Sequence, residues 1–396
     1  MAHPSPLLDR HTAADAMMLP YGPPESPINV PGAFDALELE YAALRKGCVL
    51  VDAPHRATIE VTGDDRLPFL DAMITQKARD QQPFRTRRSF WLTKQGRIVS
   101  DLRLTQLPDR MLVDVDPFAV EETLKTLDQY LFAEDAALAD TTAAQHRFWL
   151  MGPTSARLLE LTAEHSDGPA PADLEPDQAC VVRLGGSAVV VERSDLVGDL
   201  GFELTVPTDA VGAVWDALAD VGVHPAINPE TGQPSSEPTP TQSEIRGRTA
   251  GWLAINTARI EAGVPLFNVD FGTSSLPGET GVLRDRVDFN KGCYLGQEIV
   301  ARMDSRGALK QRVAAVRFEG TEVPASGVQL HAEDDSPVGV VTSSTLSPML
   351  GSVPIALATL RQSALEPGTK VTALTPGGRA AGTVQPELAQ WRRPTS

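Results

Sequence analysis

DRVDFNKGCYLGQEIVARM, residues Asp285–Met303, is the stretch that decides how the rest of the chain is interpreted. Within it the thiol of Cys293 follows Lys291, and Gly292 and Gly296 allow a turn in which backbone approaches a ligand closely. A neighbouring cation favours the thiolate form of a cysteine, whose pKa is ordinarily about 8.5. The segment therefore predicts a reactive thiol in a turn, followed by a helix or strand. A lone cysteine is more often a small buried apolar side chain, so both interpretations stand at this point.

Size and composition indicate a folded protein of two or three domains. The chain has 396 residues, 42% of them hydrophobic and 22% charged, and a domain takes roughly 150 residues. No window approaches the roughly 18 unbroken apolar residues of a membrane span, and the N-terminus has no targeting pattern. Cys48, Cys180 and Cys293 lack the clustering of a zinc or iron-sulfur site. We expect a cytoplasmic protein with free thiols, no resident metal and no membrane partner.

The net charge of −17 argues against direct nucleic-acid binding, because neutralised phosphates supply most sequence-independent affinity. Two stretches are nevertheless basic, residues 79–103 and residues 284–312. A solvated face explains the first stretch as well as a binding role does, and it explains the second less well.

Periodicity divides most of the chain into two α+β blocks. Residues 34–48 have a helical pattern, and residues 57–63 alternate like a half-buried strand. A second block, beginning near residue 145, repeats this order of strands and helices, which suggests a divergent duplication. We predict an N-terminal tail at 1–30, a first α+β domain at 31–150 and a second at 151–305.

Composition changes twice in the second half of the chain. Residues 228–248 are rich in Pro, Ser, Thr and Glu, which predicts a mobile surface insertion. After Lys310, short Val-rich runs are separated by Gly and Pro. That spacing is typical of a small β-barrel or sandwich, and we assign it to a C-terminal domain at 310–390.

KGCYLGQE, residues Lys291–Glu298, matches every specified position of the KGCYxGQE signature of the YgfZ-like folate-binding proteins. These form a branch of the glycine-cleavage T-protein (GcvT) superfamily. Two further segments resemble landmarks of that superfamily in their usual order, RIEAGVP at Arg259–Pro265 and GVVTSSTLSPMLG at Gly339–Gly351. The resemblance covers the chain from roughly Phe34 to Leu374.

The resemblance implies an α+β, three-domain cloverleaf, in which two related α+β domains and a C-terminal β-barrel surround a central folate channel. By position, Asp101 resembles the aspartate that faces the reactive edge of the folate, and Glu203 the glutamate that grips the pterin ring. A carboxylate suits that role because it accepts two parallel hydrogen bonds. We take Asp101, Glu203 and Arg259 as candidate cofactor-binding residues, and Cys293, Lys291 and Asp101 as candidate catalytic residues. Without the resemblance, an exposed strand residue explains Asp101, and an ion pair with Glu261 explains Arg259, better than a functional role does.

Three departures distinguish this chain from the aminomethyltransferases of the superfamily. Those enzymes generally carry an Ala-Arg-Asp triplet before the RIEAG-like motif, whereas residues 254–256 read Ala-Ile-Asn, and Ile255 lacks a charge. Asp116 stands where an asparagine is expected. The signature around Cys293 is also foreign to the transferases, whereas Asp101 is common to both branches. These departures favour the YgfZ-like branch.

The resemblance implies a tetrahydrofolate-binding protein that supports assembly or repair of iron-sulfur clusters, and indirectly tRNA modification. The cofactor is tetrahydrofolate or a derivative, and iron-sulfur clients or assembly proteins are candidate partners. We expect Arg284, Arg286, Lys291 and Arg302 to attract the glutamate tail of the folate or an acidic partner. Two alternatives remain: a folate-dependent aminomethyltransferase or other one-carbon transferase, and an interaction protein with a degenerate folate site.

Overall fold

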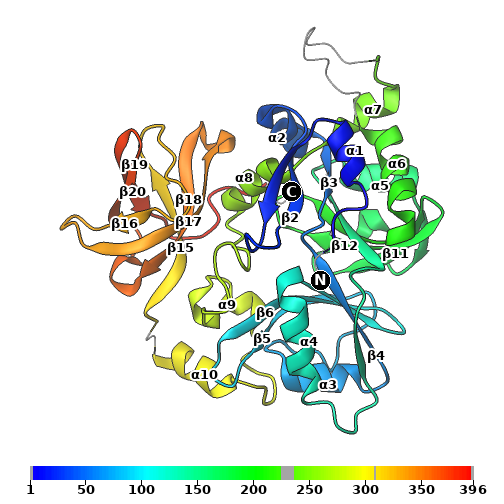
Figure 1. Cartoon of the computed structure of the whole chain (residues 1–396), viewed down its shortest axis with the longest axis horizontal. Coiled ribbons are helices and arrows are strands. Elements are labelled where there is room, and N and C mark those ends of the chain that lie inside the picture. Colours follow the sequence, from blue (N-terminus) through cyan, green and yellow to red (C-terminus); the bar gives the residue numbers. More distant parts are fainter. Residues whose placement is uncertain (1–2, 224–235, 307–308, 394–396) are drawn as a thin grey trace.

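The computed structural model describes residues 3–223, 236–306 and 309–393. Within these residues the strands form a two-stranded hairpin, a seven-stranded sheet, a five-stranded sheet and a closed six-stranded barrel. Figure 1 shows the barrel at the left, separated from the two sheets by α8 and α9. This is the expected mixed α+β architecture with a C-terminal β-barrel.

The seven-stranded sheet is covered by helices on both faces. Leu158 of α5 and Val214 of α6 pack on one face, and Leu44 of α2 and Ile255 of α8 pack on the other. Neighbouring strands are antiparallel, except that β14 runs parallel to β3. In sheet order the strands are β10 (Glu164–Asp167), β11 (Ala179–Leu184), β12 (Ser187–Ser194), β13 (Gly201–Pro207), β9 (Gln145–Met151), β3 (Cys48–Asp52) and β14 (Gly247–Thr249). The helices are α2 (Leu37–Lys46), α5 (Ser155–Thr162), α6 (Val211–Gly222), α7 (Pro240–Ile245) and α8 (Trp252–Ala262).

The five-stranded sheet packs one face against helices from two distant parts of the chain. Leu70 of α3 and Leu127 of α4 share its core with Tyr294 and with Val300 of α10. In sheet order the strands are β5 (Thr86–Leu92), β6 (Ile98–Gln106), β7 (Met111–Val115), β4 (Ala57–Thr62) and β8 (Ala137–Asp140), all antiparallel. The helices are α3 (Arg66–Met73), α4 (Val120–Asp128), α9 (Leu283–Arg286) and α10 (Gln297–Arg306).

The barrel has its own core and docks on α8. Phe318, Leu330 and Leu360 fill its interior, while Ile260 of α8 packs against Val313 on its outside. In closed order the strands are β15 (Gln311–Phe318), β18 (Val353–Arg361), β17 (Pro337–Ser347), β16 (Gln329–His331), β19 (Lys370–Thr375) and β20 (Gly378–Val384).

The first thirty residues are not a simple tail, and here the prediction is wrong. They form α1 (Leu8–Ala13) and a hairpin of β1 (Met17–Tyr21) and β2 (Ile28–Ala33). His11 is buried beside Trp215 of α6, and Ile28 and Val30 are buried as well. Pro23, Pro24 and Pro27 lie in the turn between β1 and β2.

The predicted helix at 34–48 and strand at 57–63 are confirmed as α2 and β4. The boundary predicted at residue 150 does not separate the sheets. β3 precedes the five-stranded sheet in the chain yet pairs with β9 after it, and Tyr294 packs into the core of the earlier sheet. Each α+β unit is therefore discontinuous in sequence, because strand pairing joins segments that local patterns do not connect.

The predicted surface insertion at 228–248 lies partly outside the described residues, which resume at 236. Its later part contains α7, with a capping box at Thr239 and Gln242, and the beginning of β14. Ile245 is fully buried, so this part of the segment packs on the seven-stranded sheet.

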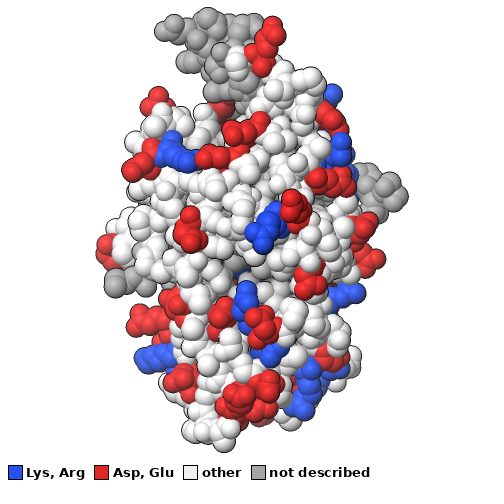
Figure 2. All heavy atoms as spheres, turned by 90° about the vertical axis from the view of Figure 1, so that its right-hand side faces the viewer, with Lys and Arg blue, Asp and Glu red and all other residues white. Residues whose placement is uncertain are grey.

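The described residues contain no helix long and apolar enough to cross a membrane. Figure 2 shows acidic side chains spread over one face, with basic side chains mostly beside them. Arg10, for example, lies 2.5 Å from Asp216, and Arg157 lies 3.3 Å from Glu244.

Candidate functional site

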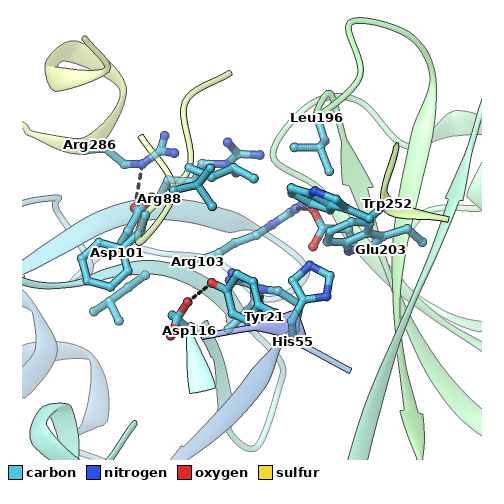
Figure 3. A pocket seen from close by; sticks show the side chains of 17 residues that line it. Tyr21, His55, Arg88, Asp101, Arg103, Asp116, Leu196, Glu203, Trp252 and Arg286 are labelled. Carbon is cyan, nitrogen blue, oxygen red and sulfur yellow. Dashed lines mark hydrogen bonds and ion pairs between the residues drawn. The ribbon is translucent and has the colours of Figure 1, made fainter. Parts of the chain in front are cut away.

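A narrow cavity lies between the two sheets (Figure 3). Its volume is about 80 Å³. The five-stranded sheet and its flanks contribute Arg88, Asp101, Arg103, Asp114 and Asp116, and the seven-stranded side contributes Trp149, Leu196, Glu203 and Trp252. Tyr21, His55 and Arg286 complete much of the lining.

Alternation along the strands explains why this cavity is polar. In β6, Leu102 and Leu104 point into the core behind the sheet. Asp101 and Arg103 therefore share the opposite face, because successive side chains of a strand alternate. β13 follows the same rule, with Phe202 and Leu204 in the core and Glu203 toward the cavity.

Glu203 is buried and already has partners in the protein. Its Oε1 accepts a hydrogen bond from Arg103 Nη1 at 2.6 Å and another from Ser194 Oγ at 2.9 Å. Burial alone would raise the pKa of Glu203, but Arg103, Arg88 and Arg147 together outweigh this effect and hold the pKa below its usual range. Glu203 is therefore a carboxylate near neutral pH.

A second, partly buried ion pair lines the cavity. Arg56 donates two hydrogen bonds to Asp114, from Nε at 3.1 Å and from Nη2 at 2.6 Å. Burial opposes ionisation of Asp114, yet Arg56 and Arg147 lower its pKa. Bidentate pairing of this kind fixes both side chains in position.

Asp101 lies at the other end of the cavity from Glu203 in Figure 3. Its Oδ1 accepts a hydrogen bond from Arg286 Nε at 2.9 Å, and its side chain is 16% exposed. The second oxygen of this carboxylate remains able to accept a hydrogen bond from a ligand.

Tyr21, Asp116 and His55 form the remaining polar wall. The hydroxyl of Tyr21 donates to Asp116, and burial raises the pKa of both groups. Burial also lowers the pKa of His55 to about 3, so this imidazole is neutral near pH 7. Within the described residues, neither His55 Nδ1 nor Trp149 Nε1 has a hydrogen-bond partner although both are buried. Unpaired buried polar atoms in a cavity wall suit contact with a ligand.

Two larger cavities adjoin the narrow one. The first, of about 800 Å³, shares Arg88 and Arg286 with it, and we call it the cationic cavity. Its lining includes Arg88, Arg284, Arg286, Arg312 and Arg392, opposed by Asp195, Asp285 and Glu387. The second, of about 750 Å³, shares Tyr21, Phe267 and Val269 and is lined largely by apolar groups, so we call it the apolar cavity. The three spaces are neighbours, and residues of both sheets and of the barrel contribute to their walls.

Of the three candidate cofactor-binding residues, Asp101 and Glu203 line the narrow cavity, at opposite ends of it, whereas Arg259 lies elsewhere. Arg259 is fully buried in α8. It donates to Asp270 Oδ2 at 2.7 Å, to the carbonyl of Val264 at 3.0 Å and to Ser343 Oγ at 2.6 Å. Its donors are thus directed to the protein, and it does not line the narrow cavity among the described residues.

Lys291 has a structural environment that its sequence position did not reveal. Its ammonium donates to the carbonyls of Asp71, Ile74 and Gln76 at 2.5, 2.8 and 2.9 Å. An ammonium has three donors, so none remains for the thiol of Cys293. Cys293 itself is exposed and lines none of the three spaces described above. The expected activation of this thiol by Lys291 therefore lacks a contact.

Three other cations were expected to attract the folate tail or an acidic partner, and they lie in two different places. Arg284 and Arg286 line the cationic cavity, whereas Arg302 lies on α10 beside Glu298, at 2.5 Å. Sequence analysis missed Arg103, Arg56 and His55. The signal for Arg103 was present, because Asp101, Arg103 and Thr105 alternate with leucines in β6.

Comparisons with known proteins agree with this architecture. Residues 7–231 match the family model of the GCVT N-terminal domain, and residues 310–388 match that of the glycine cleavage T-protein C-terminal barrel domain. The chain is 27% identical over 372 residues to an aminomethyltransferase of Cutibacterium acnes, covering 92% of this chain and 93% of the relative. It is 25% identical over 378 residues to one of Chlorobium luteolum, covering 95% of each.

A solved structure shows the same fold. The glycine cleavage system aminomethyltransferase T from Bartonella henselae superimposes with a TM-score of 0.82, at 20% identity and over 99% of both chains. The two domain matches and the full-length relatives lead to one conclusion: the chain belongs to the glycine cleavage T-protein (GCVT) family.

Proposed function

We propose that this protein binds tetrahydrofolate or a derivative in its central channel and, in that state, supports assembly or repair of iron-sulfur clusters. An effect on tRNA modification would then be indirect, through iron-sulfur enzymes. The observation that carries the folate part is the position of Glu203 and Asp101 in one cavity at the centre of a GCVT-family fold. The names of the two relatives reported above, both aminomethyltransferases, support a folate-dependent role as well.

The cavity suits the pterin end of a folate. A carboxylate at Glu203 accepts hydrogen bonds from the N3–H and 2-amino groups of a pterin. Trp149 and Trp252 offer apolar surface beside it, and His55 and Trp149 offer unpaired nitrogen atoms. Asp101, at the other end, faces the edge of the ring on which one-carbon units are carried, as the family resemblance implies.

The cationic cavity suits the glutamate tail. Arg284 and Arg312 line this cavity but not the narrow one, whereas Arg88 and Arg286 border both spaces. Guanidinium groups bind carboxylates through parallel hydrogen bonds. With the pterin near Glu203, the tail would extend toward these arginines. Of the four cations expected from the sequence, Arg284 and Arg286 keep this role in the proposal.

The iron-sulfur part of the proposal rests on KGCYLGQE and the exposure of Cys293. The segment begins with a lysine that fastens it to α3 and ends in α10, so the thiol is displayed on an anchored loop. Cys48 and Cys180 are buried and are not available to share a cluster with it. Any cluster handled at Cys293 would therefore need ligands from a partner protein.

A folate-dependent aminomethyltransferase is the second candidate, favoured by the names of the full-length relatives and by Asp101 in the cavity. One observation weighs against it: Ile255, which replaces the expected arginine, is fully buried in an apolar core. Transfer of an aminomethyl carbon from a carrier to tetrahydrofolate by the purified protein would promote this candidate.

Calorimetric titration with tetrahydrofolate tests the folate part. Glu203→Gln should weaken binding about 10- to 100-fold, because it removes a charge-assisted hydrogen bond of about 1.5–3 kcal/mol. Glu60→Gln is the matched control, since Glu60 pairs with Arg110 away from the cavity. Unaltered affinity in the Glu203 variant, or no binding by the wild-type protein, would reject the site.

Genetic complementation tests the iron-sulfur part. In cells that lack this protein, the activity of an iron-sulfur enzyme should be restored by the wild-type chain and not by Cys293→Ser. Full restoration by the serine variant would show that Cys293 is not required for this function, and that conclusion would not depend on the result of the folate titration.

A further inference from the structure

Arg103 reaches across the junction of the two sheets to a pair of carboxylates. It extends from β6, and in Figure 3 its side chain crosses the cavity to meet Glu203. Glu192 and Glu203 are register partners on β12 and β13, so their side chains share a face and lie next to each other. Arg103 therefore faces two acceptors and not one.

The contacts of Arg103 are unevenly distributed between these acceptors. Nη1 lies 2.6 Å from Glu203, whereas Nε lies 3.9 Å from Glu192 and has no hydrogen-bond partner within the described residues. Nη2 donates to the carbonyl of Arg193. The side chain is only 7% exposed, so water does not readily satisfy the unpaired Nε. A small movement toward Glu192 would give that donor an acceptor.

The guanidinium of Arg103 presents the kind of donor edge that Glu203 would bind in a ligand. A 2-amino-4-oxopyrimidine ring offers neighbouring N–H groups in a plane, and so does a guanidinium. Such a ring edge would bind through both oxygens of Glu203, but Oε1 already accepts hydrogen bonds from Arg103 and Ser194, which use its two acceptor positions. The space left beside Arg103 is also small: the narrow cavity measures about 80 Å³, whereas sites for ligands of drug size measure about 300–1,000 Å³.

We infer that Arg103 is a built-in occupant of the Glu203 subsite, and that a ligand with a 2-aminopyrimidinone edge binds only when Arg103 moves from Glu203 to Glu192. This inference rests on the proposed folate function and adds a residue that sets affinity. The free protein then keeps Glu203 paired and closed, and only a ligand that replaces the guanidinium's hydrogen bonds opens the site. Only molecules in which Arg103 has left Glu203 can bind the ligand. The apparent affinity is therefore the intrinsic affinity multiplied by the fraction of such molecules.

Titration of tetrahydrofolate into Arg103→Met tests the inference. Methionine keeps most of the length and removes the donors, so apparent affinity should rise about tenfold. Arg88→Met is the matched control: Arg88 is the register partner of Arg103 on β5 and lines the same cavity, but its ion pair is with Asp195. Loss of this charge must not tighten binding, because it does not release Glu203.

The outcomes separate this inference from the folate proposal. Tighter binding by Arg103→Met alone supports it. Binding by the wild-type protein that is equal or weaker in Arg103→Met overturns it and leaves the folate site standing. Absence of binding by both folded proteins rejects the folate proposal and this inference with it.

A second variant covers the case in which Arg103→Met does not fold. Glu192 does not line the cavity within the described residues, yet the inference makes it the receiver of Arg103. Glu192→Gln should therefore weaken tetrahydrofolate binding severalfold, although Glu192 itself does not contact the ligand. Unchanged affinity in a folded Glu192→Gln protein would overturn the inference that Arg103 moves from Glu203 to Glu192.

Discussion

At the scale of single residues, Asp52 at the end of β3 connects three parts of the chain. Its carboxylate accepts a hydrogen bond from Ser5 at 2.5 Å and is bonded to His11 Nε2 at 2.7 Å and His146 Nε2 at 2.5 Å. Burial alone would raise the pKa of Asp52, but the interactions with His146 and His11 together outweigh it and hold the pKa well below its usual range. This one side chain fastens α1 to the seven-stranded sheet.

We predict that Asp52→Asn lowers the free energy of unfolding by about 3 kcal/mol, because it removes a buried carboxylate that is hydrogen-bonded to Ser5, His11 and His146. The pKa of Asp52 is lower in the folded protein than in the unfolded chain, where it is about 4. The ionised carboxylate therefore stabilises the folded protein at pH values above about 4, and this stabilisation is lost as the pH falls through the pKa of the folded state. The difference from wild type should therefore persist from pH 7 to pH 5 and shrink in stronger acid, as urea unfolding at each pH would measure.

Asp216→Asn is the control for Asp52, because Asp216 joins the same helix to α6 through the half-exposed pair with Arg10. An exposed pair contributes at most about 1 kcal/mol. Equal losses in the two variants would contradict the special role of the buried carboxylate.

At the scale of elements, the C-terminus of α3 is capped by the side chain of a lysine that lies more than 200 residues further along the chain. Lys291 donates to three carbonyls at and beyond the end of α3, and Asp71 Oδ1 lies 3.7 Å from its ammonium. A cation at this end also interacts favourably with the helix dipole. Burial lowers the pKa of Lys291 despite these partners. The lysine of the signature therefore anchors the loop that displays Cys293.

We predict that Lys291→Met lowers the free energy of unfolding by about 3 kcal/mol, since it leaves buried carbonyls unpaired. Thiol labelling of the native protein reports on Cys293, because Cys48 and Cys180 are buried, with pKa values raised to about 12 by burial. The labelling rate of Cys293 should change less than twofold in a folded Lys291→Met protein, because the ammonium has no donor left for the thiol.

Lys125→Met serves as the control for stability, because Lys125 is exposed on α4, 3.9 Å from Glu122. A marked fall in thiol reactivity on loss of Lys291 would show that the ammonium activates Cys293 after all and would revive the catalytic role expected from the sequence.

At the scale of the whole molecule, the RIEAG segment is a junction between the body and the barrel. Arg259 pairs with Asp270 and bonds Ser343 of β17. Glu261, also fully buried, pairs with Arg45 of α2 at 2.5 Å and accepts from Ser347 of β17. The two charged residues of the motif thus face different partners, and each one reaches the barrel.

We predict that Arg259→Met lowers the free energy of unfolding by about 3–5 kcal/mol, the usual loss when one member of a buried pair is removed. The barrel should become the first part released by limited proteolysis, because Arg259 joins it to α8. Tetrahydrofolate affinity of the protein that remains folded should stay within about twofold of wild type.

Arg379→Met is the matched control within the barrel, where Arg379 and Asp335 form an exposed pair at 2.9 Å. If Arg259→Met abolished ligand binding at full stability, Arg259 would regain the cofactor-binding role that the sequence suggested for it.

Much of the molecule was determined locally and could be predicted from the sequence. The helix predicted at 34–48 and the strand at 57–63 follow from which side chains face a core, and the Val-rich runs after residue 310 predicted a small β-barrel or sandwich, which the structure shows to be a closed barrel. Asp101 and Glu203 were found through the family resemblance, and both line one cavity. These features depend on short-range patterns or on motifs that keep their spacing.

Tertiary structure decided which of these residues meet. β3 pairs with β9 across the whole five-stranded unit, so no window of sequence reveals that the α+β units interleave. Arg259 and Lys291 were expected to contact the ligand. In the structure each donates its hydrogen bonds to carbonyl or carboxylate groups of the protein instead. Arg103 was overlooked for the same reason: a charged residue in a strand acquires its role only from the sheet it faces. The sequence alone determined the elements, the barrel and the family, whereas pairing of buried charges, which depends on contacts far apart in the chain, determined the site.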